Sequence, residues 1–271
     1  MTMVTTMIKL SACIEMLFRE VEFLQRIVET KRLGLDAYEF WSWANKDLDA
    51  LEAQQRATGL KLAALAAAAR SNTLFSDRNR QNLVDPANRA DFVQGIAESV
   101  EVATRLGCPT IIVTVGNELP NRSREEQRQS IIDGLIAAAP LAERGGVTLV
   151  VEPLNTLVDH KGYFLWSSRE GFEIVRAVGS PHVKLLYDIY HQQIMEGNLI
   201  ATIEANIDLI GHFHMADVPG RHEPGTGEIN YLNVLRRIAA TGYQGYVGLE
   251  LRPTKPTHEA LRDFVQAVAA L

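Results

Sequence analysis

Strand-like and helix-like segments alternate along the whole chain, and this alternation limits the folds open to it more than any other feature. Runs of β-branched and aliphatic residues are each followed by a stretch with apolar residues at helical spacing. Strands are predicted at 8–14, 37–43, 60–69, 110–115, 148–152, 184–188, 211–214 and 246–250. Helices are predicted at 17–30, 47–58, 91–106, 123–144, 168–178, 199–206, 231–241 and 257–271.

The segment 60–69 is the ambiguous member of this series. Its alanines favour a helix by intrinsic propensity, but the alternation requires a strand there, and we predict a strand. An open, doubly wound nucleotide-binding sheet would carry a Gly-rich turn after its first strand, and residues 11–20 contain no glycine. Eight strand–helix units in 271 residues therefore predict the α/β class, as a single (β/α)8 TIM barrel domain spanning residues 1–271.

The composition argues against nucleic acid and membranes as partners of this chain. A net charge of −6 and a pI of about 5.7 argue against a nucleic-acid partner. No apolar run reaches 18 residues and no basic-then-apolar leader opens the chain, so we expect a cytoplasmic protein without membrane contact. Cys13 and Cys108 lack a C-x-x-C spacing, suit a reducing compartment and are expected to be buried hydrophobes.

Four potential metal ligands lie at the ends of four successive predicted strands: Glu152, Asp188, His214 and Glu250. They are 36, 26 and 36 residues apart, close to the length of one strand–helix repeat. The C-terminal ends of barrel strands share one face, so these side chains are expected to converge. Any one acid alone is better explained by pairing with a nearby Arg or Lys, but four at equivalent positions favour a metal site. Oxygen and nitrogen ligands without thiolates suit Mn²⁺, Mg²⁺ or Co²⁺.

Two further residues lie near these strand ends. His191 follows the second ligand by three residues and is predicted to bind substrate at the rim of the same pocket. Arg221 lies in a polar, Gly- and Pro-rich loop at 216–228, where its guanidinium can bind a carboxylate, hydroxyl or enolate oxygen of a substrate. A salt bridge from Arg221 to Glu223 or Glu228 is an equal alternative.

A second histidine and several aromatic residues each admit two roles. His212 and His214 are separated by one residue, so both imidazoles point to the same face of the sheet. His214 is nearer the strand end and is the predicted ligand, whereas His212 supports it or belongs to the core. Trp41, Trp43 and Phe75 follow the second and third strands, where packing is the more common role and lining of the pocket mouth is the alternative.

Two carboxylates beside one metal ion suggest a class of reaction. A metal that chelates a carbonyl and the adjacent hydroxyl oxygen acidifies the C–H bond between them and stabilises the enediolate. Glu152 and Glu250 belong to the fifth and eighth strands, so they would face a substrate from two sides, one removing the proton and the other returning it. The pattern predicts aldose–ketose isomerisation or epimerisation next to a carbonyl.

The C-terminal half also resembles the xylose-isomerase-like barrel superfamily, and within it the hydroxypyruvate isomerase family. The matching segments are VEPLN at 151–155, LYDIYH at 186–191, HMADVPGRHEPGTGEINY at 214–231 and GLELRP at 248–253. The resemblance implies a divalent ion held by the four strand-end residues, with Glu152 and Glu250 as the acid–base pair. It also implies that His191 and Arg221 contact substrate oxygens, and that the reaction interconverts hydroxypyruvate and tartronate semialdehyde.

One position departs from the closer family. Hydroxypyruvate isomerases often carry glutamine where this chain has His214, whereas sugar epimerases carry histidine. A 2-oxotetronate isomerase or a ketose 3-epimerase is therefore an alternative. Phosphodiester hydrolysis, as in endonuclease IV on a related barrel, would need a multi-metal cluster richer in histidine and a basic surface; this chain has seven histidines and a negative charge. A non-catalytic sugar-binding barrel would not need two opposed proton acceptors.

The expected partner of the site is a small hydroxy-carbonyl compound or a sugar. The sequence leaves open its carbon number and stereochemistry, the preferred ion, and whether the chain forms a homo-oligomer.

Overall fold

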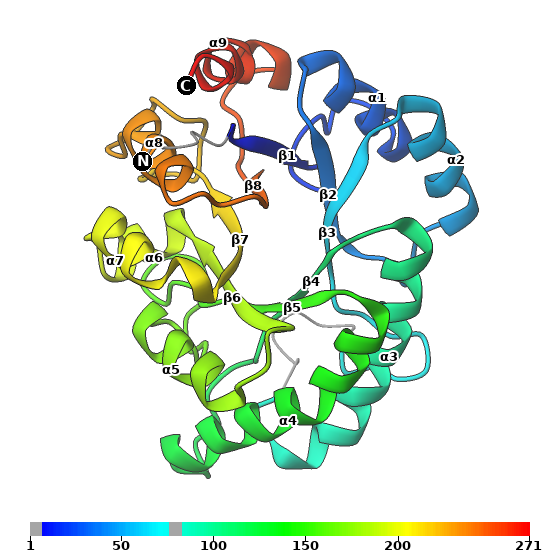
Figure 1. Cartoon of the computed structure of the whole chain (residues 1–271), viewed down its shortest axis with the longest axis vertical. Coiled ribbons are helices and arrows are strands. Elements are labelled where there is room, and N and C mark those ends of the chain that lie inside the picture. The colour runs from blue at the N-terminus through cyan, green and yellow to red at the C-terminus, as the bar shows by residue number, and fades with distance from the viewer. Residues whose placement is uncertain (1–6, 76–82) are drawn as a thin grey trace.

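The computed structural model describes residues 7–75 and 83–271. Within these ranges eight parallel strands close into a barrel in sequence order, with nine α-helices around it (Figure 1). The strands are β1 (Lys9–Cys13), β2 (Ala37–Ser42), β3 (Lys61–Ala66), β4 (Thr110–Val113), β5 (Thr148–Val151), β6 (Val183–Asp188), β7 (Ile210–Met215) and β8 (Tyr246–Leu249). The helices are α1 (Phe23–Leu33), α2 (Leu48–Thr58), α3 (Arg89–Leu106), α4 (Arg124–Gly145), α5 (Ser168–Val178), α6 (Ile189–Met195), α7 (Leu199–Asn206), α8 (Tyr231–Ala240) and α9 (Thr257–Ala269). The predicted (β/α)8 barrel is confirmed.

Local sequence signals explain where many of the helices begin and end. In α4 the Ser123 hydroxyl accepts the backbone N–H of Glu126 while the Glu126 side chain accepts that of Ser123, a reciprocal capping box. At the other end Gly146 adopts the left-handed conformation, with φ of 65°, and its N–H bonds the last turn. Such caps satisfy backbone groups that would otherwise be left unpaired, so each crossover helix stops where the next strand must start.

The predicted strand at 60–69 is confirmed as β3, against the helical propensity of its alanines. Leu62, Ala63, Ala64 and Leu65 are all fully buried, and the strand pairs with β2 on one side and β4 on the other. A parallel barrel strand is covered on both faces, so burial and pairing outweigh a propensity difference of well under 1 kcal/mol per residue.

Two helix predictions differ from the structure. The first helix begins at Phe23 rather than at residue 17, because the chain makes a turn in which Leu17 and Phe18 are buried and Phe18 has φ of 56°. The short helix α6 was not predicted. It follows β6 without a loop, and the carboxylate of Asp188 caps it by accepting the backbone N–H groups of Tyr190 and His191.

The interior of the barrel has an apolar side and a polar side. Ala64, Ile112, Val150 and Leu186, from β3 to β6, form an apolar cluster that is separate from the large core between barrel and helices. On the side of β1, β2 and β7, the buried residues are instead polar: Ser11, Glu39 and His212. Buried polar groups need hydrogen-bond partners, so this side must be organised as a network.

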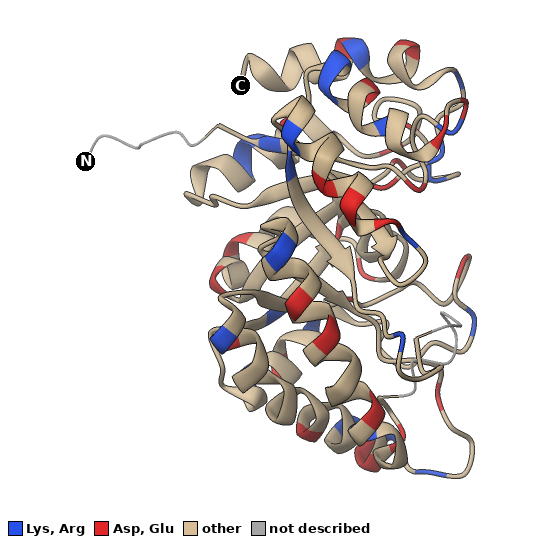
Figure 2. Cartoon of the chain, turned by 90° about the vertical axis from the view of Figure 1, so that its right-hand side faces the viewer, with Lys and Arg blue, Asp and Glu red and all other residues tan. Residues whose placement is uncertain are grey.

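Charged residues of both signs are interspersed along the outer helices and loops (Figure 2). This distribution is that of a solvated surface with little long-range field of one sign. In the described part of the chain no helix combines the length and the apolar character needed to cross a membrane.

Candidate active site

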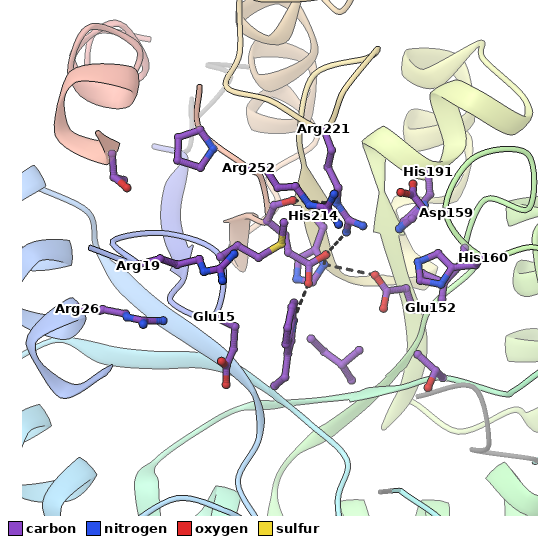
Figure 3. A pocket seen from close by; sticks show the side chains of 18 of the residues that line it. Glu15, Arg19, Arg26, Glu152, Asp159, His160, His191, His214, Arg221 and Arg252 are labelled. Carbon is purple, nitrogen blue, oxygen red and sulfur yellow. Dashed lines mark hydrogen bonds and ion pairs between the residues drawn. The ribbon is translucent and has the colours of Figure 1, made fainter. Parts of the chain in front are cut away.

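A cavity of about 1100 Å³ opens at the C-terminal ends of the barrel strands. Figure 3 shows side chains from several βα loops pointing into it. Its floor carries Glu152, His214 and Glu250, while Trp41 and Ile112 add apolar surface. A cavity of this kind at this face is where the catalytic residues of TIM barrels lie.

The four predicted ligands come together at this floor. Glu152 directly follows β5, Asp188 ends β6, His214 lies in β7 and Glu250 directly follows β8. One ligand atom from each lies within 4.8 Å of all the others, and all four side chains are buried. His214 Nδ1 is 3.4 Å from Glu152 Oε1 and 3.5 Å from Glu250 Oε2. Four residues spread over a hundred positions of sequence thus form one cluster.

Four atoms of this cluster have no hydrogen-bond partner among the described residues: Glu152 Oε1, Asp188 Oδ2 and both ring nitrogens of His214. Buried polar atoms are nearly always satisfied, and carboxylates gathered in a dry pocket repel one another unless a cation lies between them. Carboxylate oxygens with one imidazole nitrogen are a ligand set that Mn²⁺, Mg²⁺ or Co²⁺ accepts. The residues present therefore fit a divalent ion.

Arg221 brings a positive charge of the protein's own to the cluster. Its guanidinium pairs with Glu250 Oε2, and Nη2 is 3.8 Å from Asp188 Oδ2. The alternative of a salt bridge to Glu223 or Glu228 is wrong, because these two carboxylates bond to other side chains. Arg221 therefore faces the site.

The charged groups of the cluster shift one another strongly. Burial raises the pKa of Asp188 to about 7, against the opposing charges of Arg221 and His214. Burial also acts to raise the pKa of Glu250, but Arg221 and His214 outweigh it and hold that pKa well below its usual range. For His214, burial favours the neutral ring, and Glu39 and Glu250 outweigh burial and raise the pKa well above its usual value. Binding of a cation would therefore release a proton from this histidine.

His191 is fully buried in the first turn of α6 and presents one nitrogen to the site. Its Nδ1 accepts the backbone N–H of Asn155 at 3.1 Å, so the proton of the neutral ring is on Nε2. Burial, with the nearby charge of Arg221, lowers the pKa of His191 well below its usual value. Nε2 lies 3.4 Å from Asp188 Oδ2 and has no hydrogen-bond partner in the described structure. A neutral imidazole thus offers one N–H to the site.

The sequence analysis missed several residues at or near the cavity, among them Glu39, Asp159 and His160. Glu39 lies in β2 with Oε1 2.9 Å from His214 Nε2, and its signal was a lone acid inside an apolar strand. Asp159 and His160 line the cavity from the loop after β5. Their side chains are placed by the fold of that loop, which no local pattern marks.

The aromatic residues considered for the mouth have separate roles. Trp41 lines the cavity, and its Nε1 donates to Glu250 Oε1 at 2.8 Å. Trp43 is buried, and its Nε1 donates to Ser99 Oγ at 3.0 Å. Phe75 is buried against Phe92, with ring centroids 6.1 Å apart. Only the first of the three therefore touches the predicted ligands.

One buried carboxylate holds the loop that carries Arg221. Asp217 accepts the backbone N–H groups of Val218, Gly225, Gly227 and Ile229. Arg221 itself has φ of 59°, which is unusual for a residue with a side chain and must be held by its surroundings. The Asp217 carboxylate therefore joins both ends of the loop, beside backbone bonds such as that from Arg252 N–H to the Arg221 carbonyl.

Replacing Asp217 with asparagine is expected to lower the free energy of unfolding by about 1–3 kcal/mol, since buried N–H groups would lose a charged acceptor. Urea denaturation measures the change. The exposed Glu228→Gln in the same loop is the control, with an expected effect within about 0.5 kcal/mol. Equal stability of the two variants would show that the loop does not depend on Asp217.

Several known proteins are similar to this chain in sequence. The model of the xylose isomerase-like TIM barrel family matches residues 27–268. The hydroxypyruvate isomerase of Escherichia coli (strain K12) is 32% identical over 263 residues, which cover 94% of this chain and 98% of that protein. The 2-oxo-tetronate isomerase of Cupriavidus necator is 34% identical over 253 residues, covering 93% of this chain and 96% of that protein.

Two solved structures show the same architecture. An AP endonuclease, family 2, from Brucella melitensis superposes with a TM-score of 0.85 at 28% identity, over 96% of this chain and 99% of that one. A 3-keto-D-glucoside 4-epimerase from E. coli, in its apo form, gives a TM-score of 0.78 over 98% of this chain and 100% of that one. At 23% identity this second likeness concerns the fold alone.

Proposed function

The chain belongs to the xylose isomerase-like TIM barrel family, and we propose that it is a divalent-metal-dependent isomerase of a small hydroxy-carbonyl compound. The leading reaction is the interconversion of hydroxypyruvate and tartronate semialdehyde through an enediolate. The observation that carries the proposal is the buried cluster of Glu152, Asp188, His214 and Glu250, with ligand atoms within 4.8 Å of one another. The names of the relatives, hydroxypyruvate isomerase and 2-oxo-tetronate isomerase, support it.

The two glutamates are proposed to move the substrate proton. A divalent ion held by the four ligands supplies the positive charge that acidifies the C–H bond and stabilises the enediolate. Glu152 and Glu250 enter the cavity from β5 and β8, so one carboxylate can take the proton from C3 of hydroxypyruvate and the other can deliver one to C2. The C3 hydroxyl loses its proton as the C2 oxygen gains one, so the isomerisation balances within the substrate.

Two further residues are proposed to hold the substrate oxygens. His191 Nε2–H is an unpaired neutral donor, suited to an oxygen that gains negative charge during the reaction. Arg221 can fork onto two oxygens at once, and its contact with Glu250 keeps it beside the reacting carbons. These roles orient the substrate and add no proton transfer of their own.

Arginines at the mouth favour an acid as the substrate. Arg19, Arg26 and Arg252 line the cavity, and Figure 3 shows Arg19 and Arg252 reaching towards its centre. Among the described residues Arg19 and Arg252 have no carboxylate within ion-pair distance, although the chain as a whole is acidic. Unpaired guanidinium groups are suited to a substrate carboxylate. This feature supports hydroxypyruvate or a 2-oxotetronate over a neutral sugar.

A ketose 3-epimerase is the second candidate, favoured by two observations. The floor ligand is His214, the residue type that the resemblance associates with sugar epimerases. The cavity, of about 1100 Å³, is also much larger than a three-carbon acid requires. In that case Glu152 and Glu250 would remove and return the proton at the same carbon from opposite faces.

Solvent exchange tests the proposal and separates the candidates. The Mn²⁺-loaded protein is incubated in D₂O with hydroxypyruvate, a 2-oxotetronate and a neutral ketose, and deuterium at the α-carbons is followed by NMR. Incorporation into the acids is the expected result, and incorporation at C3 of the ketose alone would favour the epimerase. If none of the three acquires deuterium, the protein is not an isomerase of this class.

A further inference from the structure

A buried polar network lies inside the barrel next to the ligand cluster. Its centre is Glu39, a residue of β2 with only 2% of its surface exposed. Glu39 Oε2 accepts the Ser11 hydroxyl at 2.9 Å and His212 Nε2 at 3.0 Å. Glu39 Oε1 faces His214 Nε2 at 2.9 Å. The network thus ends on the nitrogen of His214 that points away from the other ligands.

The barrel backbone leaves space for this carboxylate. A Cβ atom at Gly248 of β8 would lie 2.3 Å from Glu39 Oε1 and 2.7 Å from Oε2, closer than van der Waals contact permits. Any other residue at this position would therefore displace the carboxylate. Burying a charge here costs free energy, and the opposite side of the same interior is filled with apolar residues. A role in function explains why this side is not.

Within the network, the buried oxygen Glu39 Oε2 is supplied with hydrogen-bond donors. The His212 N–H points at that oxygen, and the Ser11 hydroxyl donates to it as well. Glu39, His212 and His214 also come close enough to serve as metal ligands themselves. Oε1 and His214 Nε2 lie 2.9 Å apart, and neither makes a hydrogen bond among the described residues. A proton on Nε2 would satisfy both atoms without a second ion, and the number of bound ions distinguishes the two cases.

We propose that Glu39 is a positioning residue that sets how His214 is presented to the ion. With Nε2 held against Glu39, the ring turns Nδ1 towards Glu152 Oε1 and Glu250 Oε2, at 3.4 and 3.5 Å. A carboxylate on the far nitrogen fixes the tautomer and makes the ligating nitrogen more basic. The inference rests on the metal site of the proposed function, and not on which substrate is bound.

Metal binding to the chelator-treated protein tests this role without using activity. Glu39→Gln keeps the volume of the side chain and removes its charge, so Mn²⁺ measured by calorimetry should bind about 10–100-fold more weakly than to the unsubstituted chain. Ser11→Ala is the graded variant, since it removes one donor to Glu39 and leaves the contact with His214. Its loss of affinity should be smaller. Glu15→Gln, which changes a carboxylate paired with Lys46 at the mouth, should leave Mn²⁺ affinity unchanged.

A second measurement uses the unsubstituted protein, so its result does not depend on whether a variant folds. Nitrogen-15 NMR of histidine in the Mg²⁺-loaded chain should show His214 protonated on Nε2, with Nδ1 as the ligating nitrogen. Ligation through Nε2 would overturn the inference. The inference would also be overturned if the Glu39→Gln variant bound Mn²⁺ as tightly as the parent. The same holds if the parent bound two ions and the Glu39→Gln variant bound one. If the parent chain binds no divalent ion, the proposed metal site itself is wrong. If it binds the ion tightly but does not isomerise the substrates, only the proposed reaction is wrong.

Discussion

Glutamine in place of Glu152 or Glu250 is expected to lower kcat for the isomerisation by about 10²–10⁴-fold, because each change removes a carboxylate proposed to carry the substrate proton. The two variants should differ in what they retain. Each keeps one carboxylate, so each should still exchange deuterium into the one substrate whose C–H bond faces that group. Exchange measured separately from hydroxypyruvate and from tartronate semialdehyde therefore assigns the two glutamates to the two carbons.

Both glutamates are also proposed ligands, so loss of metal must be separated from loss of the proton carrier. Metal content is determined for each variant, and exchange is measured at saturating Mn²⁺. Glu101→Gln, on the exposed face of α3, is the matched control for the same chemical change and should keep full activity. A Glu152 or Glu250 variant that holds Mn²⁺ and isomerises at the parent rate would rule that residue out as a proton carrier.

Removal of the divalent ion is expected to abolish activity and to lower thermal stability. Three carboxylates and a histidine meet within 4.8 Å, so the ion neutralises repulsion that otherwise remains in the folded state. A ligand bound only by the folded chain stabilises it by about 2.7 kcal/mol at 100 times its Kd. Dialysis against EDTA followed by addition of Mn²⁺, Mg²⁺ or Co²⁺ should restore activity and raise Tm.

Asp188→Asn provides the control for this experiment. Asp188 is a proposed ligand that is not proposed to carry a proton, so its replacement should remove most of the metal-induced rise in Tm. If EDTA-treated protein keeps its activity, or if the variant responds to Mn²⁺ as the parent does, the cluster is not the site of a functional ion.

The fold and the convergence of the four predicted ligands were accessible from the sequence because both depend on local features. The alternation of strands and helices follows from the pattern of neighbouring residues. A residue at the C-terminal end of a parallel barrel strand lies on the same face of the barrel as the other strand ends. β3 is a strand despite the helical propensity of its alanines, because both of its edges pair with β2 and β4 and both of its faces are buried. Helix α6 is too short to show the spacing of apolar residues by which a helix is predicted. Its N-cap residue, Asp188, was interpreted as a metal ligand and not as the start of a helix.

Glu39 was missed for a different physical reason. Its partner His212 is 173 residues away in sequence, and the two meet only because the closed barrel brings β7, β8, β1 and β2 next to one another around a shared interior. No pattern within β2 reveals that contact. The partner of Arg221 was missed likewise, because the loop that turns it towards Glu250 is held by backbone N–H groups on Asp217.

The apolar side of the barrel interior bears on how such an enzyme can acquire new substrates. Ile112 belongs to that apolar cluster and also lines the cavity, so it forms part of the floor without touching the polar network. A smaller side chain there would deepen the floor while leaving every ligand and every hydrogen bond of the network in place. The depth of the floor can then change through β4 while the polar network on the side of β1, β2 and β7 keeps its hydrogen bonds.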